Sequence, residues 1–169
     1  MNANQTFGLV CAHHHLYSSL ARGMPSPDEI PSSFEDILNS VWWRLDRALD
    51  LETIEWSAKL GALEALERGT TCIIDHHESP NAIEGSLSVI QNACNELGVR
   101  VNTCYGVTDR NSKDFSTDTP MTEEARRGLE ENKRFLQEGG VGMVGIHAAF
   151  TCSDETLNSA AQLAVDMGV

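Results

Sequence analysis

Short apolar runs alternate with longer helix-like stretches along this chain of 169 residues. Four runs are typical of strands, at residues 7–12, 70–75, 99–107 and 141–147. The helix-like stretches lie at residues 34–48, 51–68, 83–97, 122–137 and 153–167. Strands that alternate with helices predict an α/β fold with a parallel sheet. Because the runs show little polar alternation, we expect both faces of the strands to be buried.

The first apolar run ends in three consecutive histidines, His13, His14 and His15. Side chains alternate between the two faces of a strand, so His13 and His15 point to one side and His14 points to the other. Two imidazoles one strand repeat apart can bind a single metal ion as neighbouring ligands. The alternative interpretation is a polar strand end that carries three solvated histidines.

Two further runs also end in polar side chains. Asp75, His76 and His77 close the second run, and His147 closes the fourth. The carboxyl ends of parallel strands meet at one edge of a sheet, which is where α/β proteins keep their sites. We therefore expect a functional site at that edge.

The composition narrows the set of partners. A formal net charge of −13 would repel a nucleic-acid backbone and an anionic membrane surface, so we expect neither partner. No apolar stretch approaches the ~18 residues of a membrane span, and the N-terminus lacks the pattern of a signal peptide. The five cysteines are an odd number without a Cys-x-x-Cys pair, which favours reduced thiols and a cytoplasmic location.

Several segments resemble the amidohydrolase superfamily, in its deaminase and chlorohydrolase branch. GLVCAHHHL at 8–16 followed by LARG at 20–23 is similar to the first strand of that branch, and GTT at 69–71 leading into Asp75 is similar to the second. HAAFTCS at 147–153 resembles a His-Ala-Pro-Tyr-Thr-Cys-Ser segment, with Ala and Phe in place of Pro and Tyr. The nearest match is to SsnA-type aminohydrolases, on WWRLD at 42–46, DHHESPN at 75–81, EGSL at 84–87 and VTDR at 107–110.

The resemblance implies a TIM-type (β/α)8 barrel, of which this chain would hold the first four strands and their helices. Eight such units need ~250 residues, so residues 1–169 are expected to form a single partial barrel domain. A half barrel leaves two strand edges and one sheet face uncovered. We therefore expect self-association or a second chain that completes the barrel. The chain would then be a truncated form, a partial gene product or one half of a split enzyme.

In the complete family enzyme, one divalent metal activates water for attack on a ring carbon that carries an amino group or a chlorine. The resemblance assigns His13 and His15 as ligands of that metal, with zinc as the first choice and iron as the second. The third and fourth ligands and the proton-shuttling glutamate belong to strands five and eight, which are expected beyond Val169.

The resemblance also places His147 and Asp46 near the substrate. The alternatives are a hydrogen-bonded rim histidine for His147 and an ordinary helix-surface aspartate for Asp46. The branch holds one metal, so Asp75, His76 and His77 are interpreted as hydrogen-bonded rim residues. The expected function is hydrolytic deamination at a C–N bond of a small amidine-like or heterocyclic molecule. The alternative function is a non-catalytic half-barrel module that needs a partner chain to complete its site.

Overall fold

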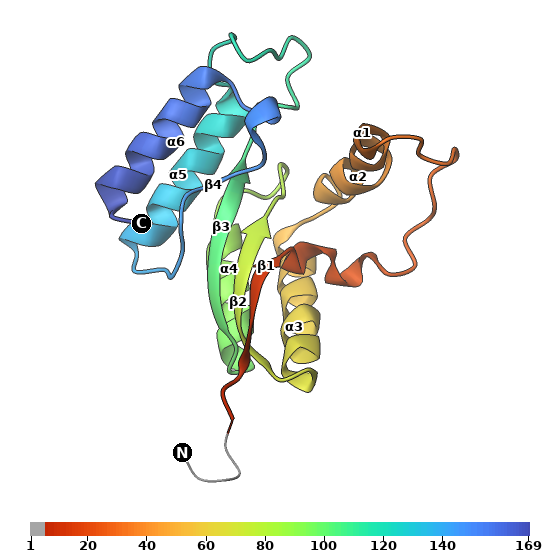
Figure 1. Cartoon of the computed structure of the whole chain (residues 1–169), viewed down its shortest axis with the longest axis vertical. Coiled ribbons are helices and arrows are strands. Elements are labelled where there is room, and N and C mark those ends of the chain that lie inside the picture. The colour runs from red at the N-terminus through yellow and green to blue at the C-terminus, as the bar shows by residue number, and fades with distance from the viewer. Residues whose placement is uncertain (1–5) are drawn as a thin grey trace.

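The computed structural model describes residues 6–169, and its centre is one four-stranded parallel sheet (Figure 1). The strands lie in sequence order: β1 (Leu9–His14), β2 (Thr70–His77), β3 (Arg100–Val107) and β4 (Gly145–Ile146). Each neighbouring pair is parallel. This arrangement confirms the predicted parallel α/β fold, and it brings the carboxyl ends of the strands to one edge.

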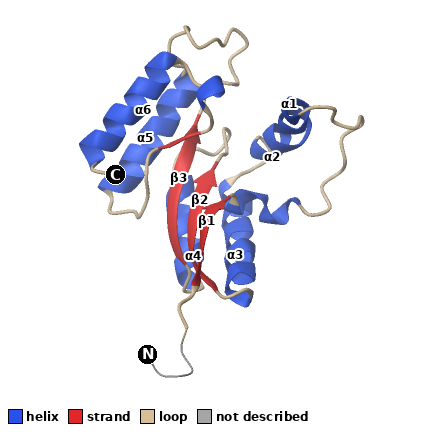
Figure 2. Ribbon diagram, viewed as in Figure 1, coloured by secondary structure: helices blue, strands red, loops and turns tan. Residues whose placement is uncertain are grey.

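Four long helices pack with this sheet (Figure 2): α3 (Leu51–Glu67), α4 (Ser86–Glu96), α5 (Glu123–Gln137) and α6 (Asp154–Met167). Three of them begin at a capping side chain that accepts a backbone N–H of the first turn, from Asp50, Thr122 and Ser153. Two short helices, η1 (Leu16–Ala21) and η3 (Ala149–Thr151), follow β1 and β4. The helices α4 and α5 both contact β3.

Two apolar clusters hold the sheet against its helices. The first joins α3 and α4 to β2 and β3, and its members Ile54, Ile73 and Val101 are at most 4% exposed. The second joins β3 to α5 and α6, and includes Tyr105 and Phe135. Complete burial of a side chain of this size stabilises a fold by about 1.5–3 kcal/mol. The strands β2 and β3 are therefore the firmly packed part of the sheet.

The strand β1 is much less covered. Leu9 and Val10 are 61% and 60% exposed, whereas Val101 and Val107 of β3 are 4% and 0% exposed. Among the described residues, β1 is an edge strand with β2 as its one neighbour. The expectation that both faces of every strand are buried is therefore wrong for β1, because nothing within residues 6–169 covers these side chains.

The regular helix predicted over residues 34–48 is wrong in its middle. The segment consists of α1 (Phe34–Ile37), a π-helical turn η2 (Leu38–Trp42) and α2 (Trp43–Asp46). The Trp43 N–H donates to the carbonyl of Leu38, five residues earlier, which widens the helix at that point. Trp42, Trp43 and Asp46 all reach the cavity described below.

Two other predicted boundaries shift. The helix expected at 83–97 begins only at Ser86, because Gly85 has a φ of 84°, outside the helical region. The strand expected at 141–147 contains only Gly145 and Ile146, with an isolated bridge from Gly142. Here the chain crosses β3 closely: a Cβ atom on Gly145 would lie 2.5 Å from the Sγ atom of Cys104. The fourth strand is therefore a short edge strand that pairs with β3 at two positions, Gly106 with Gly145 and Val107 with Ile146.

No helix within residues 6–169 combines the length and the apolar character that crossing a bilayer requires. All five cysteines are free thiols, which agrees with the predicted reduced state, and three of them are buried: Cys94, Cys104 and Cys152.

Candidate metal and substrate site

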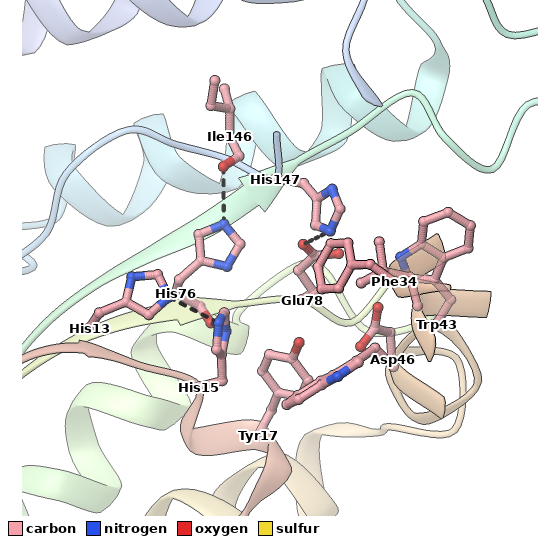
Figure 3. A pocket seen from close by; sticks show the side chains of 12 residues that line it. His13, His15, Tyr17, Phe34, Trp43, Asp46, His76, Glu78, Ile146 and His147 are labelled. Atoms are coloured by element: carbon pink, nitrogen blue, oxygen red, sulfur yellow. Dashed lines mark hydrogen bonds and ion pairs between the residues drawn. The ribbon is translucent and has the colours of Figure 1, made fainter. Parts of the chain in front are cut away.

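A cavity of about 360 Å³ lies at the carboxyl ends of the strands. The four residues that the sequence analysis assigned to metal or substrate all line it, and Figure 3 shows them around one space: His13, His15, Asp46 and His147. The other lining residues are Tyr17, Phe34, Leu38, Trp42, Trp43, His76, Glu78 and Ile146. The fold thus gathers residues from the beginning, middle and end of the chain at the predicted edge.

His13 and His15 form one end of the cavity, which we call the imidazole end. Their Nε2 atoms are 3.1 Å apart, as expected when alternate residues of a strand share a face. The Nδ1 atom of His15 lies 2.9 Å from the backbone carbonyl of His76. A carbonyl only accepts hydrogen bonds, so this Nδ1 atom carries the proton and Nε2 keeps its lone pair. His14 does not line the cavity.

The donor set of the imidazole end fits a divalent ion such as zinc. Zinc–nitrogen bonds are ~2.0–2.1 Å long, and two nitrogens 3.1 Å apart can both reach one ion at that length. A hydrogen bond from the second ring nitrogen, as in His15, is the usual way in which a ligating imidazole is oriented. Within residues 6–169, His, Cys, Asp and Glu side chains form no group of three or more that could hold a metal. The two imidazoles are therefore one ligand short of the three that a catalytic zinc site takes from its protein.

Burial favours the neutral form of three imidazoles around the cavity, those of His15, His76 and His147. Removal from water is the largest cause in each case: it lowers the pKa of His15, and it lowers the pKa of His76 to about 4 and that of His147 to about 3. His76 donates from Nε2 to the carbonyl of Ile146 at 3.1 Å, while its buried Nδ1 atom has no hydrogen-bond partner. A neutral imidazole is the form that can ligate a metal or accept a hydrogen bond.

Asp75 and His77 support the strands beneath the cavity. The Asp75 carboxylate accepts from the backbone N–H of Leu16 at 2.7 Å and from the Thr103 hydroxyl at 3.0 Å, which ties β2 to η1 and to β3. Burial raises the pKa of Asp75 to about 7. His77 Nε2 lies 2.8 Å from a serine hydroxyl. These contacts agree with the interpretation as rim residues, and His76 is the one of the three that reaches the cavity.

Asp46, Glu78 and Arg110 form the opposite end of the site, which we call the carboxylate end. Their side chains are 2%, 3% and 3% exposed. Arg110 donates from Nη2 to Asp46 Oδ2, and its Nη1 atom lies 2.5 Å from Glu78 Oε2. The guanidinium lies over the Trp43 ring, 5.1 Å from the ring centroid. The interpretation of Asp46 as an ordinary helix-surface aspartate is therefore wrong, because Asp46 is buried in an ion pair.

Burial and the guanidinium act in opposite directions on these carboxyl groups. Desolvation is the larger effect and raises the pKa of Asp46 and of Glu78, and Arg110 offsets part of that rise. His147 lies close to this end, with its Nε2 atom 3.7 Å from Glu78 Oε1. Its Nδ1 atom is 2.8 Å from the hydroxyl of Thr151. His147 is therefore hydrogen-bonded at the rim and still presents its ring to the cavity.

The sequence analysis assigned no role to Glu78 or Arg110. Glu78 directly follows β2, and Arg110 stands three residues after β3, both within segments that carry the family resemblance. Charged residues just beyond the carboxyl ends of parallel strands are the signal that could have indicated them. Their pairing with Asp46 joins positions far apart in the sequence, and no spacing rule predicts such a pairing.

Comparison with known proteins extends this description. The Amidohydrolase family profile matches residues 6–169. The 5'-deoxyadenosine deaminase of Methanopyrus kandleri is 32% identical over 168 residues, which cover 96% of this chain and 34% of that protein. The 5-methylthioadenosine/S-adenosylhomocysteine deaminase of Aquifex aeolicus is 29% identical over 158 residues, which cover 93% of this chain and 34% of that protein. The chain thus spans about a third of the length of these curated relatives.

Solved structures share the fold at lower identity. Atrazine chlorohydrolase from Arthrobacter aurescens TC1, complexed with zinc, superposes with a TM-score of 0.69 at 20% identity, over 96% of this chain and 39% of that chain. Guanine deaminase of E. coli gives a TM-score of 0.69 at 21% identity, over 94% of this chain and 34% of that chain. These matches confirm the predicted half of a TIM-type barrel. The profile match over all described residues shows that this chain belongs to the amidohydrolase family.

Proposed function

We propose that this chain is the metal-binding part of a hydrolase that deaminates a small amidine-like or heterocyclic molecule. The observation that carries the proposal is the imidazole end, where His13 and His15 converge to 3.1 Å with the proton of His15 held on the far nitrogen. The family membership and the names of the curated relatives, which are deaminases, support the same reaction.

In this proposal His13 and His15 hold one divalent ion, zinc in the first instance and iron in the second. Zinc is favoured because a structural neighbour is complexed with it and because imidazole nitrogen suits it well. When bound, the ion supplies an activated water molecule for hydrolysis at neutral pH. The His76 carbonyl keeps the His15 ring in the ligating tautomer.

We propose that the substrate lies between the imidazole end and the carboxylate end, in contact with Asp46 and His147. Both side chains line the cavity, and Asp46 Oδ1 has no hydrogen-bond partner of good geometry within residues 6–169. Trp43 and other aromatic residues form the walls between the two ends, and flat walls suit a planar ring. The relatives act on adenosine derivatives according to their names, so an aminopurine is the first substrate class to test.

The remaining ligands and the proton-shuttling glutamate would come from further polypeptide, either a second chain or residues that continue this one. Two facts support this part of the proposal: the described residues hold no metal-binding group of three, and the curated relatives are about three times as long as the matched region.

Metal binding tests the proposal most directly. Equilibrium dialysis of the full chain against excess zinc, followed by elemental analysis, is expected to give about one zinc per chain. His13→Ala should lose that zinc, because one imidazole alone binds weakly. His14→Ala is the matched control and should keep it, since His14 lies outside the cavity. Equal zinc content in all three proteins would contradict the proposal.

The second candidate is the non-catalytic half-barrel module, which is favoured by the absence of a third ligand among residues 6–169. A polypeptide carrying strands five to eight of a family member separates the two functions. Deaminase activity that returns when the two chains are mixed, and that depends on His13, supports the enzyme. A stable complex that binds no metal supports the module.

A further inference from the structure

The carboxylate end contains more carboxyl groups than basic groups. Two carboxyl groups, Asp46 and Glu78, meet a single guanidinium, Arg110, and each of the three side chains is at most 3% exposed. Water therefore cannot screen an unmatched charge, and a buried carboxyl group without a partner holds its proton to higher pH: burial raises the pKa of Glu78 to about 8. The neighbouring imidazole of His147 is neutral at pH 7, because burial lowers its pKa to about 3, so it adds no positive charge.

The guanidinium does not line the cavity, and its two terminal nitrogens lie against the two carboxyl groups, although Nε and Nη1 make no hydrogen bond of good geometry within the described residues. Its Nη2 atom donates to Asp46, its Nη1 atom lies 2.5 Å from Glu78, and its face stacks on Trp43. Asp46 and Glu78 line the 360 Å³ cavity, whereas Arg110 does not. A molecule inside the cavity therefore meets the carboxyl groups and not the base that pairs with them.

One carboxylate oxygen lacks a hydrogen bond of good geometry among the described residues, and the nearby Tyr17 hydroxyl lowers the pKa of the same carboxyl group. Asp46 Oδ2 is taken by Arg110, but Asp46 Oδ1 is buried and has no hydrogen-bond partner in the structure. A buried acceptor without a donor is costly and calls for a partner. The gap between His147 Nε2 and Glu78 Oε1, 3.7 Å, is also too long for a hydrogen bond. Asp46, Glu78 and His147 all line the same cavity (Figure 3).

We infer that the carboxylate end binds a planar cation of the amidinium or guanidinium type, with Asp46 and Glu78 as its acceptors. The inference rests on the proposed function and narrows its substrate class. The substrate would carry N–H donors and a positive charge at the end that lies away from the reacting carbon. A fork of parallel N–H groups matches a carboxylate in geometry as well as charge. The aromatic walls formed by Phe34, Trp42 and Trp43 attract such a cation through their faces.

In this arrangement Arg110 is a positioning residue. It holds the two carboxyl groups in place and cancels one of their two charges, which leaves one negative charge for the ligand when Glu78, whose pKa is raised to about 8, is ionised. Glu78 is the group whose ionisation distinguishes a cation from a neutral molecule, because Arg110 makes its hydrogen bond to Asp46 Oδ2 and only an ion pair with Glu78.

Three molecules of the same shape test the inference: benzamidine, benzamide and benzoate, which carry positive, zero and negative charge. Binding is followed by tryptophan fluorescence of the metal-free full chain at about pH 9, where both carboxyl groups are ionised. All proteins carry Trp56→Phe, because Trp56 is 57% exposed and outside the cavity. Benzamidine is expected to bind at least about tenfold more tightly than benzamide, since charged hydrogen bonds contribute about 1.5–3 kcal/mol, and benzoate should bind most weakly.

Glu78→Gln is expected to reduce the preference for benzamidine over benzamide by about tenfold, while Arg110 remains paired with Asp46 and the fold is kept. Asp46→Asn provides a second variant with the same expected direction if Glu78→Gln unfolds. Glu84→Gln is the matched control, because Glu84 pairs with Arg127 on the surface, and it should change nothing.

Equal affinity for benzamidine and benzamide, tighter binding of benzoate, or an unchanged preference in a folded Glu78→Gln protein would overturn the inference. The experiment uses no metal and no turnover. A negative result here therefore does not affect the assignment of His13 and His15 as metal ligands. A negative zinc experiment likewise does not affect the measured preference for benzamidine over benzamide.

Discussion

The two ends of the cavity are built from titratable side chains in opposite ways. At the imidazole end, His13 lies in β1 and His15 directly follows that strand, and their rings meet without an ionic partner among the described residues. At the carboxylate end, Asp46, Glu78 and Arg110 come from three separate segments and are almost completely buried. The imidazole end is therefore built from neighbouring residues of the chain, with one long-range contact, from His15 to the His76 carbonyl of β2. The carboxylate end exists only when the tertiary structure is complete.

The strands that lead to the two ends of the cavity differ in how far their side chains are buried. The strand β1, which carries the imidazoles, is exposed at Leu9 and Val10, while β3, which leads to Arg110, is buried at Val101 and Val107. A ligand site on an exposed edge strand can vary without loss of the fold. We expect the stability of the molecule to depend far more on the carboxylate end and on β3.

Arg110→Ala should have the largest effect on stability. It leaves two buried carboxyl groups without their base, and breaking a buried ion pair from one side costs about 3–5 kcal/mol. The free energy of unfolding in urea, measured by circular dichroism, gives the value. Arg127→Ala is the control on the surface pair with Glu84, and its cost should stay below about 1 kcal/mol. Similar costs for both variants would show that the carboxylate end is not the rigid part of the site.

Asp75 should make the protein less stable as the pH rises. Burial raises the pKa of Asp75 to about 7, against about 3.9 in an unfolded chain. The folded state therefore holds a proton that the unfolded state has lost, and the stability present below pH ~4 decreases up to pH ~7. The expected loss is on the order of a few kcal/mol.

Asp75→Asn isolates this contribution, because the amide keeps an acceptor for the Leu16 N–H and does not titrate. The difference in unfolding free energy between the two proteins should grow in favour of the variant from pH 4 to pH 7. A constant difference across this range would mean that Asp75 is ionised in the fold, and that its two hydrogen bonds outweigh the desolvation.

A pair of valine substitutions compares the two strands directly. Val101→Ala in β3 should cost about 2 kcal/mol, because the side chain is 4% exposed and leaves a cavity. Val10→Ala in β1 should cost less than about 0.5 kcal/mol, since that side chain is 60% exposed. Both are measured by urea unfolding at equal chain concentration. A larger cost for Val10→Ala would indicate that β1 is covered in solution by a second chain.

The same contrast explains what the sequence could predict. Strand alternation alone is sufficient to place His13 and His15 on one face, and capping side chains such as Asp50 and Thr122 mark helix starts through contacts within a few residues. The helix order and the parallel sheet follow from similar local signals. The burial of β1 was predicted wrongly because its apolar residues suit a sheet with more neighbours than residues 6–169 provide.

The carboxylate end could not be predicted from the sequence and became visible only in the structure. The π-helical turn at Leu38–Trp42 has no clear sequence signal, and it is the turn that leads into Trp43 and Asp46. The ion pairs of Arg110 then join segments 32 and 64 positions away, as the differences 110 − 78 and 110 − 46 show. Contacts of that kind depend on how strands and helices pack, and local patterns do not encode them.

The smallest expected effect concerns the imidazole end in the presence of metal. His13→Ala alone should change the unfolding free energy little, because His13 is exposed and makes no ion pair. Zinc should stabilise the original chain and His14→Ala by about 1.4 kcal/mol when the free zinc is ten times the dissociation constant, and should not stabilise His13→Ala. Urea unfolding with and without zinc provides the measurement. Stabilisation of His13→Ala by the same amount would place the metal elsewhere, and the cavity would then be defined by its carboxylate end alone.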